Sequence, residues 1–331
     1  MVILYNKLFL FRKYFILFLF FFLINLFLNN NSEANDSFDN WLLIFKEEAI
    51  NEGISKNTLN LLNDIKPNKK IIKLDRNQPE FKLTFKNYFS KVVSKNRIKN
   101  AKIKLNDNQI LLKPISKKYN VQSRFIISLW GIESNFGNNM GKSNILQSLV
   151  TLAFDGRRSK YFRKELIAAL KILEKEEINP SDFNGSWAGA MGQCQFMPTT
   201  YLKFAKDGDN DGKIDIWNNK IDVFASIANY LNNVGWNDNY TWGRKVKVPN
   251  NFNFKTFHNK RKLLEDWGKL GLTKSNGTSL PNNKIYAKYI NIDKEKDLSF
   301  LVYQNYDAIL KWNRSNYFAL SVSLLSDKLI N

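Results

Sequence analysis

The chain has 331 residues, of which 44% are hydrophobic and 14% are aromatic, and its net charge is +20. This composition excludes a disordered or fibrous protein, because it supplies enough apolar surface for a sizeable core. The charge favours an anionic partner such as a wall polymer, a membrane surface or a nucleic acid, although the lysines are scattered along the chain.

The first 34 residues have the pattern of a secretory signal peptide. Lys7, Arg12 and Lys13 precede a nearly unbroken apolar run over residues 14–28, and the segment 32–34 offers a small-residue cleavage site. We therefore expect a signal peptide over residues 1–34, with an uncleaved membrane anchor as the alternative. In either case the remaining residues 35–331 lie outside the cytoplasm, which argues against nucleic acid as the partner.

Helical periodicity dominates the chain up to about residue 235. Apolar residues recur at helical intervals over residues 38–72 and 81–93, and further helices are expected to about residue 178, with breaks at 135–142 and 155–158. Short alternating segments follow, which predict a small strand-containing insert over about 236–300. A C-terminal helix over about 301–331 is expected to pack on the core. The predicted fold class is mainly α.

A single carboxylate stands at the end of one predicted helix. In "NVQSRFIISLWGIESNFG", Asn120 or Ser123 can cap an apolar helix that ends near Glu133. Apolar neighbours and the negative end of the helix dipole both favour the protonated form of a carboxyl group placed there. Glu133 is therefore a candidate general acid, although an ordinary surface glutamate at a helix end would have the same pattern.

Five segments together resemble the lytic murein transglycosylase B family, which is glycoside hydrolase family 103. They are "LWGIESNFG", "GAMGQCQFMPTTY", "DGDNDGKIDIWN", "ANYLNNVGW" and "WNRSNYFAL", in the order found in that family. The resemblance covers roughly residues 38–328 and implies a lysozyme-like helical core with additional N-terminal helices. It also implies a periplasmic enzyme that acts on peptidoglycan glycan strands, and a monomer. Association with a membrane surface or with the wall-synthesis machinery stays open.

The implied reaction cleaves the β-1,4 bond between N-acetylmuramic acid and N-acetylglucosamine without water. In that reading Glu133 protonates the glycosidic oxygen and then deprotonates the muramoyl 6-hydroxyl, which closes a 1,6-anhydro ring. Ordinary glycosidases use a second carboxylate to activate water or to attack the sugar. Here the nucleophile belongs to the substrate and acts at high effective molarity, so a second carboxylate is dispensable.

The other matching segments imply substrate contacts. Glycines in "GSWAGAMGQCQFMPTTY" permit close backbone approach, while amides and aromatic rings suit N-acetyl groups and sugar faces. The expected substrate-binding residues are Ser134, Ser186, Gln193, Gln195, Tyr230, Asn313 and Tyr317. Two positions depart from the family pattern, because Trp312 replaces a frequent tyrosine and Phe318 stands where another tyrosine is common.

The segment "DGDNDGKIDIWNNKID" matches the start of an EF-hand loop, with Asp207, Asp209 and Asp211 at alternating positions. Lys213 would contribute its backbone carbonyl. The twelfth position is Asn218 rather than the usual glutamate, and the resemblance implies closure by Asp222 instead. We expect a structural Ca²⁺ that the chemistry does not require, with a solvated acidic turn as the alternative.

Several other residues have open or modest roles. Arg157 and Arg158 can meet stem-peptide carboxylates or form salt bridges. Cys194 is expected to be a packing residue and His258 a surface residue, because thiol catalysis would need the two close together. Two other functions stay open, namely a muramidase that uses water with a second acid such as Asp155, and a non-catalytic wall-binding scaffold.

Overall fold

The computed structural model describes residues 37–77 and 83–330, so the predicted signal peptide lies outside the described residues. The chain divides into two compact units, Met1–Asp64 and Ile65–Asn331. Within the described ranges, every helix is too short or too polar to cross a membrane.

The described part of the first unit is a helical pair, in which residues 37–51 form one helix and α2 spans Lys56–Asn60. The Ser55 side chain accepts a hydrogen bond from the backbone N–H of Thr58 and so caps α2. Phe38 and Phe45 are buried, and each stacks on Trp41 within the longer helix. The three rings are spaced three and four residues apart, which is the helical spacing of apolar residues seen in the sequence.

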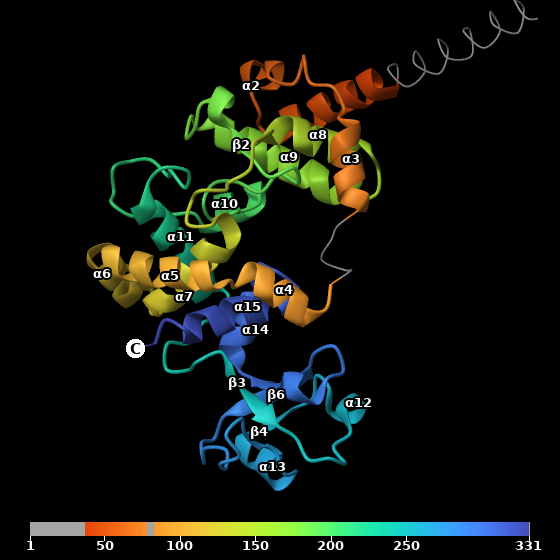
Figure 1. Cartoon of the computed structure of the whole chain (residues 1–331). Helices are drawn as coiled ribbons and strands as arrows, with labels where there is room; N and C mark the ends of the chain where they lie inside the picture. The colour runs from red at the N-terminus through yellow and green to blue at the C-terminus, as the bar shows by residue number, and fades with distance from the viewer. Residues whose placement is uncertain (1–36, 78–82, 331) are drawn as a thin grey trace, which may run out of the picture. The chain divides into compact units, whose positions relative to one another are not determined.

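The second unit is mainly helical, and Figure 1 shows its helices in chain order. The α-helices are α3 Lys69–Arg76, α4 Phe85–Val92, α5 Lys95–Asp107, α6 Gln109–Tyr119, α7 Ser123–Ser134, α8 Ile145–Phe154, α9 Ser159–Glu174, α10 Pro198–Phe204, α11 Lys220–Asn233, α12 Phe254–Phe257, α13 Leu264–Lys269, α14 Gln304–Trp312 and α15 Asn316–Asp327. Among the described residues, short 3-10 helices also occur at η2 Pro180–Asp182 and η3 Lys296–Leu298. The mainly α fold class is thus confirmed.

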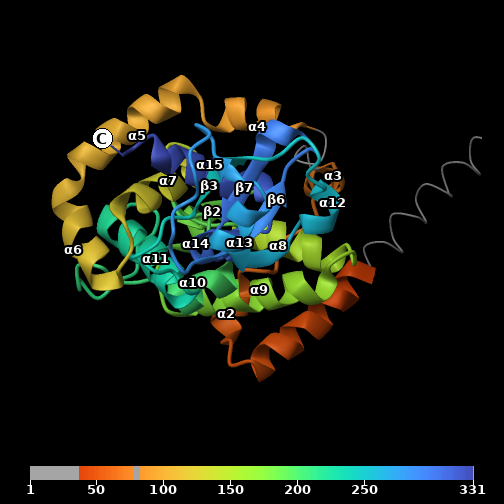
Figure 2. The ribbon, with the colours of Figure 1, turned by 90° about the horizontal axis from the view of Figure 1, so that it is seen from below.

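Helix α7 lies at the centre of this helical unit. Its residues 125–131 are all buried, and it contacts α5, α6, α11 and α15. Figure 2 shows α5 and α6 outside α7, along one edge of the unit. Because α7 is buried on every side over these two turns, it can contribute to a solvent-accessible site at its C-terminal end.

A five-stranded antiparallel sheet follows α11 in the chain. Its strands are β3 Gly243–Lys247, β4 Arg261–Leu263, β5 Thr273–Lys274, β6 Tyr286–Asn291 and β7 Ser299–Val302, in the order β4-β6-β7-β3-β5. Tyr289 on β6 pairs with Leu301 on β7, and both pack with Trp267 of α13 in a small hydrophobic core. The sheet therefore has a core of its own. A separate two-stranded pair joins β1 Ser143–Asn144 to β2 Asn184–Gly185.

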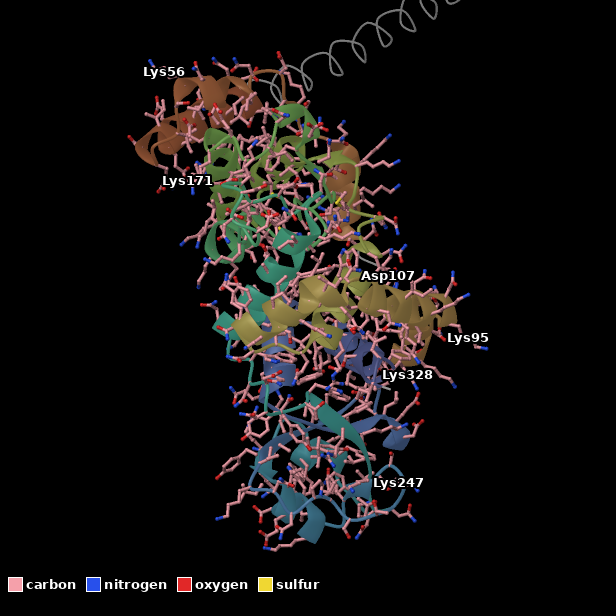
Figure 3. All side chains as sticks on the ribbon, turned by 90° about the vertical axis from the view of Figure 1, so that its left-hand side faces the viewer. Lys56, Lys95, Asp107, Lys171, Lys247 and Lys328 are labelled. Atoms are coloured by element: carbon pink, nitrogen blue, oxygen red, sulfur yellow. The ribbon has the colours of Figure 1, made fainter. Side chains whose placement is uncertain are left out.

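The basic side chains are distributed over many elements, as the scattered sequence pattern predicts. Figure 3 labels Lys95 on α5, Lys171 on α9, Lys247 on β3 and Lys328 after α15. In this view Lys171 and Lys247 lie far from each other, and Lys95 and Lys328 lie between them. The positive charge is therefore a property of the whole surface, with no single basic stripe defined by these residues.

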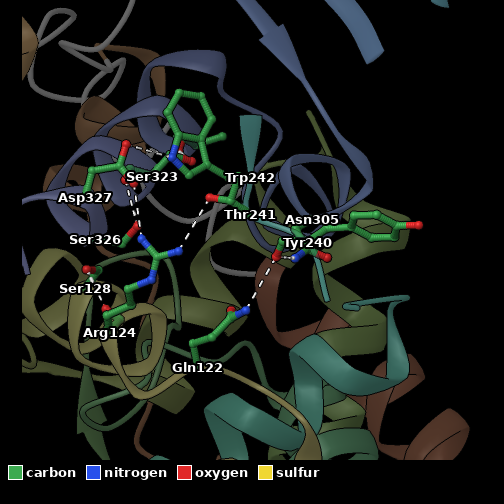
Figure 4. Close-up of polar contacts among 11 residues, drawn as sticks. Gln122, Arg124, Ser128, Tyr240, Thr241, Trp242, Asn305, Ser323, Ser326 and Asp327 are labelled. Atoms are coloured by element: carbon green, nitrogen blue, oxygen red, sulfur yellow. Dashed lines mark hydrogen bonds and ion pairs between the residues drawn. The ribbon is translucent and has the colours of Figure 1, made fainter. Parts of the chain in front are cut away.

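A partly buried polar network joins α7 to the C-terminal helix and to the start of the sheet (Figure 4). Arg124 on α7 forms an ion pair with Asp327 on α15 at 3.2 Å, and Trp242 donates its indole N–H to the same carboxylate at 3.0 Å. Gln122 donates to the backbone oxygen of Asp238 at 2.7 Å, and Asn305 donates to that of Tyr240 at 2.7 Å. These bonds hold the N-terminal end of α7, which is called the base of α7 below, in place.

The C-terminal region differs from the single helix expected over about 301–331. It comprises β7, then α14 and α15, with a break at residues 313–315. Asn313 adopts an extended backbone, and the Ser315 side chain accepts from the N–H of Phe318 to start α15. The prediction of one helix was wrong because this Asn-Arg-Ser turn caps a second helix within an otherwise helical pattern.

Candidate functional site

Glu133 lies half-buried in the last turn of α7, where the helix ends in a tight turn. Asn135 and Phe136 both have left-handed backbones, with φ of 51° and 61°, and Gly137 follows with φ of 84°. The Phe136 ring folds back against α7, so that a Cβ on Gly131 would lie 2.6 Å from it. The chain therefore stops the helix one residue after Glu133 and turns away, which leaves the carboxylate at an accessible end.

The Glu133 carboxylate has a partner 179 residues further along the chain. The indole N–H of Trp312, at the end of α14, donates to Glu133 Oε1 at 2.6 Å. The Trp312 ring is itself packed against Phe196, with centroids 5.0 Å apart, and against Tyr230 at 4.7 Å. Trp312 was noted from sequence only as a departure from the family pattern, so its contact with the acid is a finding of the structure.

Trp312 also lines a cavity of about 530 Å³. Aromatic and amide groups contribute to its wall, including Tyr161, Gln195, Phe196 and Tyr230. Two cationic side chains, Lys311 and Arg314, stand on the same wall. A cavity with aromatic faces, amide groups and an adjacent carboxylate has the chemistry of a saccharide-binding groove.

Two predicted substrate residues, Gln195 and Tyr230, belong to this cavity. The Gln195 amide nitrogen donates to the backbone oxygens of Met140 and Gly192, at 3.0 and 2.9 Å, which leaves its side-chain oxygen for a ligand donor. Tyr230 is 7% exposed, and burial raises the pKa of its hydroxyl to about 12. The hydroxyl therefore stays protonated at neutral pH and can donate.

Ser186 and Asn313 are partly committed to the backbone. The Ser186 hydroxyl oxygen accepts from the N–H groups of Ala188 and Ala190, at 3.3 and 2.9 Å. The Asn313 side-chain oxygen accepts from the N–H of Ser315 at 3.1 Å. Ser186 keeps its hydroxyl hydrogen and Asn313 its amide hydrogens, so both can still act as donors toward a substrate, and their predicted roles stay predictions.

Gln193 and Ser134 have structural roles, which corrects their prediction as substrate contacts. Gln193 is 8% exposed, accepts from the Trp130 indole at 2.7 Å and donates to the backbone oxygen of Trp217 at 2.7 Å. Ser134 is fully buried, donates to the backbone oxygen of Trp130 and accepts from the N–H of Gly137. Sequence reasoning misplaced them because residue type indicates hydrogen-bonding capacity but not which side of the wall the side chain occupies.

Tyr317 also lies elsewhere than predicted. It lines a different cavity, of about 800 Å³, together with His258 and Asp293. Its hydroxyl donates to the Asp293 carboxylate, and its ring packs edge-on against Phe85 at 5.4 Å. Because that hydroxyl is engaged away from the cavity at Trp312, it does not replace the tyrosine lost at Phe318, which is buried.

The charged residues that line the cavity at Trp312 were not predicted as site residues from the sequence, namely Glu165, Lys311 and Arg314. Glu165 is 2% exposed, and its two oxygens accept from the backbone N–H and the hydroxyl of Thr199, at 2.9 and 2.7 Å. Lys311 donates to the backbone oxygen of Val234 at 2.8 Å. Arg314 lies within the "WNRSNYFAL" motif, two residues after Trp312. Its position in a motif that matches the family could have indicated that it lies at the site.

The candidate second acid and the two arginines are engaged in ion pairs. Asp155 accepts from Arg76 at 2.8 Å and is absent from the residues that line the cavity at Trp312. Arg157 Nε donates to Asp75 at 2.7 Å, and Arg158 also pairs with that carboxylate, which is buried. Of the two readings left open for the arginines, the structure thus places them in salt bridges.

Three acidic side chains of the loop 207–212 gather as expected. Asp207, Asp209 and Asp211 each offer a carboxylate oxygen, and these atoms all lie within 4.8 Å of one another. Burial alone would raise the pKa of Asp207, but backbone N–H groups of Gly212, Asn210 and Asp211 together lower it. This set of oxygen donors fits Ca²⁺.

Lys213 and Asp222 stand outside this acidic group. Asp222 is fully buried and accepts backbone N–H groups of Gly208 and Asp215, both at 2.7 Å. Burial raises the pKa of Asp222 to about 6 in spite of these bonds. The N–H of Lys213 donates to Asp211 at 2.8 Å. The side-chain carboxylate of Asp222 therefore closes the loop by accepting from the loop's backbone N–H groups. The role of Asp222 as a metal ligand stays a prediction.

Cys194 and His258 occupy unrelated parts of the second unit. Cys194 is fully buried, and burial raises the pKa of its thiol, so it is a packing residue as predicted. His258 is half-buried and lines the cavity of about 800 Å³, and its Nδ1 accepts from the backbone N–H of Asn291 at 3.3 Å.

A half-buried carboxylate next to a cavity lined by aromatic side chains and an amide, on a mainly helical scaffold, combines the groups that an acid/base site for a sugar would need. The chain belongs to the transglycosylase SLT domain family, whose model matches residues 37–327. This finding confirms the resemblance to lytic murein transglycosylases.

Individual relatives agree with this family. The membrane-bound lytic murein transglycosylase B of Escherichia coli is 31% identical over 242 residues, which cover 71% of this chain and 64% of that protein. SltB3 from Pseudomonas aeruginosa, solved with NAG-anhNAM-pentapeptide, is 36% identical with a TM-score of 0.84, covering 88% of this chain and 79% of its own. The E. coli lytic transglycosylase Slt35, solved in complex with calcium, is 26% identical with a TM-score of 0.75. The match covers 87% of this chain and 92% of the Slt35 chain.

Proposed function

We propose that this chain is an exported peptidoglycan lytic transglycosylase in which Glu133 is the sole general acid and base. It cleaves the β-1,4 bond between N-acetylmuramic acid and N-acetylglucosamine and leaves 1,6-anhydromuramoyl ends. The observation that carries the proposal is the Glu133 carboxylate at the end of α7, bonded to Trp312 beside a cavity with aromatic and amide walls. Family membership and the anhydro-sugar ligand of SltB3 support the same reaction.

The reaction uses one carboxyl group twice. Glu133 gives its proton to the glycosidic oxygen while the bond from that oxygen to C1 breaks. The resulting carboxylate then takes the proton of the muramoyl 6-hydroxyl as its oxygen bonds to C1. The nucleophile is held within the substrate, so no water has to be activated, and the commitment of Glu165 to Thr199 and of Asp155 to Arg76 is compatible with a single acid.

The cavity residues supply binding and orientation in this proposal. Tyr230 and Trp312 offer aromatic surface, and the free side-chain oxygen of Gln195 accepts from an N-acetyl N–H or a hydroxyl. Ser186 and Asn313 donate to substrate oxygens. Lys311 and Arg314 provide positive charge beside the site, where the carboxylates of a stem peptide attached to the muramoyl residue would be attracted.

The acidic loop is proposed as a structural Ca²⁺ site. Asp207, Asp209 and Asp211 would hold the ion, which suits the hard oxygen donors that they present. Gly208 in the same loop is bonded to Asp222, at the start of α11, so the ion would tie the loop to that helix. The calcium complex of Slt35 supports this site in a related protein.

The proposed location is the periplasm, with export directed by residues 1–34 and the chain acting as a monomer on glycan strands. The basic charge of +20 supports attraction to the anionic wall and to membrane surfaces. The relative named membrane-bound lytic murein transglycosylase B is consistent with work close to a membrane.

The product mass tests the reaction. Digestion of purified murein by the mature protein should release muropeptides that carry anhydro-muramic acid, each lighter by one water than its hydrolysed counterpart. Products that end in reducing muramic acid would show a water-using muramidase instead. Binding to murein without any soluble product would show a wall-binding scaffold.

Glu133→Gln tests the assigned acid. The amide oxygen can still accept from Trp312, so the melting temperature should be unchanged, whereas turnover should fall about 100- to 10,000-fold for the loss of the proton donor. Glu265→Gln is the matched control, because Glu265 is an exposed glutamate of α13 that pairs with Lys269. Equal activity of Glu133→Gln and the control would refute the assignment.

A further inference from the structure

The bond between Trp312 and Glu133 joins two residues that the chain holds rigidly. Glu133 ends α7, whose preceding residues are buried, and Trp312 ends α14 between Phe196 and Tyr230. The donor nitrogen lies 2.6 Å from Glu133 Oε1, so the indole N–H donates a direct hydrogen bond to the acid. The indole therefore restricts the Glu133 side chain to one orientation.

An indole N–H can donate a hydrogen bond but cannot accept one. When Glu133 is protonated, the oxygen that faces the indole is best kept as the carbonyl-type acceptor, and the proton then resides on the other oxygen. A tyrosine hydroxyl, which is frequent in the family at this position, can donate or accept and so permits either arrangement. The tryptophan of this chain removes that ambiguity.

We propose that Trp312 is a positioning residue that assigns the two oxygens of Glu133 to different tasks. Oε1 stays bonded to the indole throughout the reaction. Oε2 carries the proton, releases it to the glycosidic oxygen as the C1–O bond breaks, and afterwards receives the proton of the muramoyl 6-hydroxyl. The indole bond strengthens when Glu133 becomes a carboxylate, so it stabilises the charge that forms during bond cleavage. This inference rests on the proposed function.

Three replacements of Trp312 separate the N–H group from the ring. Trp312→Phe keeps an aromatic ring and loses the donor, Trp312→Tyr offers a hydroxyl donor, and replacement by 3-benzothienylalanine keeps the indole shape with sulfur in place of N–H. We expect kcat to fall about 10- to 100-fold for Phe and for benzothienylalanine, as for loss of a bond to a charged group. Tyr should recover part of this loss.

The Michaelis constant distinguishes positioning from general damage to the groove. Because the indole N–H acts on the acid and is needed most as charge develops, KM for a soluble murein tetrasaccharide should stay within about twofold of wild type in the benzothienylalanine variant, which keeps the aromatic surface that Trp312 offers to the substrate. Trp242→Phe is the matched control, since it deletes another indole-to-carboxylate bond, to Asp327 at 3.0 Å, within the polar network at the base of α7. It should lower the melting temperature and leave kcat unchanged.

The outcomes are decisive in both directions. A benzothienylalanine variant with wild-type kcat, a Tyr variant no better than Phe, or a kcat loss equalled by Trp242→Phe would each overturn the positioning role. A wild-type enzyme that releases no anhydro-muramic acid would instead overturn the proposed function. Since benzothienylalanine preserves the packing against Phe196 and Tyr230, misfolding of the Phe variant would not obscure the result.

Discussion

The role of a side chain in this site depends on its surroundings rather than on its residue type. Gln193 and Gln195 are two residues apart and chemically identical, yet Gln193 is buried between Trp130 and Trp217, whereas Gln195 lines the cavity. A positive φ of 50° at Gln195 accompanies this change of direction. The first amide is bonded within the protein interior, and the second lines the cavity.

Gln193→Met should therefore destabilise the protein. Methionine fills a similar volume but leaves the Trp130 indole and the Trp217 carbonyl buried without partners, at a cost of about 2–4 kcal/mol in the free energy of unfolding. Urea denaturation followed by tryptophan fluorescence measures this change. An unchanged free energy of unfolding with a raised KM would show instead that Gln193 contacts substrate.

At the scale of elements, two helix ends create the catalytic contact. The turn at Asn135 ends α7 just after Glu133, and the break at residues 313–315 ends α14 just after Trp312. The acidic loop between α10 and α11 is a third element whose arrangement depends on local backbone bonds, mostly to Asp207 and Asp222.

Ca²⁺ should stabilise this loop and raise the melting temperature. An ion that binds only the folded state at ten times its dissociation constant adds about 1.4 kcal/mol, and EDTA should reverse the effect. Asp209→Asn should weaken the response, while Asp107→Asn, an aspartate at the end of α5, should respond as wild type. No rise in melting temperature at millimolar Ca²⁺, by scanning calorimetry, would contradict a calcium site.

At the scale of the whole molecule, the positive charge is spread over the second unit, on elements as separate as α5, α9 and β3 (Figure 3). A distributed charge attracts an anionic polymer over a wide area without defining one docking orientation. Orientation is left to the cavity at Trp312, where aromatic and amide contacts are directional. Capture and alignment of the glycan strand thus depend on different groups.

Binding to intact murein should therefore weaken with salt. Inactive Glu133→Gln protein sedimented with sacculi should bind several-fold less tightly at about 1 M NaCl than at 0.1 M, because screening shortens from about 10 Å to about 3 Å. A neutral chitin polymer is the matched control and should show little salt dependence. Equal salt dependence on both polymers would show that charge does not attract this protein to the wall.

The sequence alone determined the mainly α class, the family and the candidate acid, because helical periodicity and the order of motifs are local properties of the chain. It also located the breaks on either side of α8, whose turn residues lie next to one another in sequence. The grouping of Asp207, Asp209 and Asp211 followed for the same reason, since alternating positions in one loop are close in any fold.

Only the tertiary structure decided which polar side chains face the cavity. Glu133 and Trp312 meet across 179 residues, Glu165 enters the wall from α9, and Tyr317 turns toward Asp293 instead. Such pairings depend on how helices pack, and the same residue types in the same local pattern can point inward or outward. Burial and the choice of partner, which are properties of the packed molecule, therefore determine which of the predicted residues remain available to a substrate.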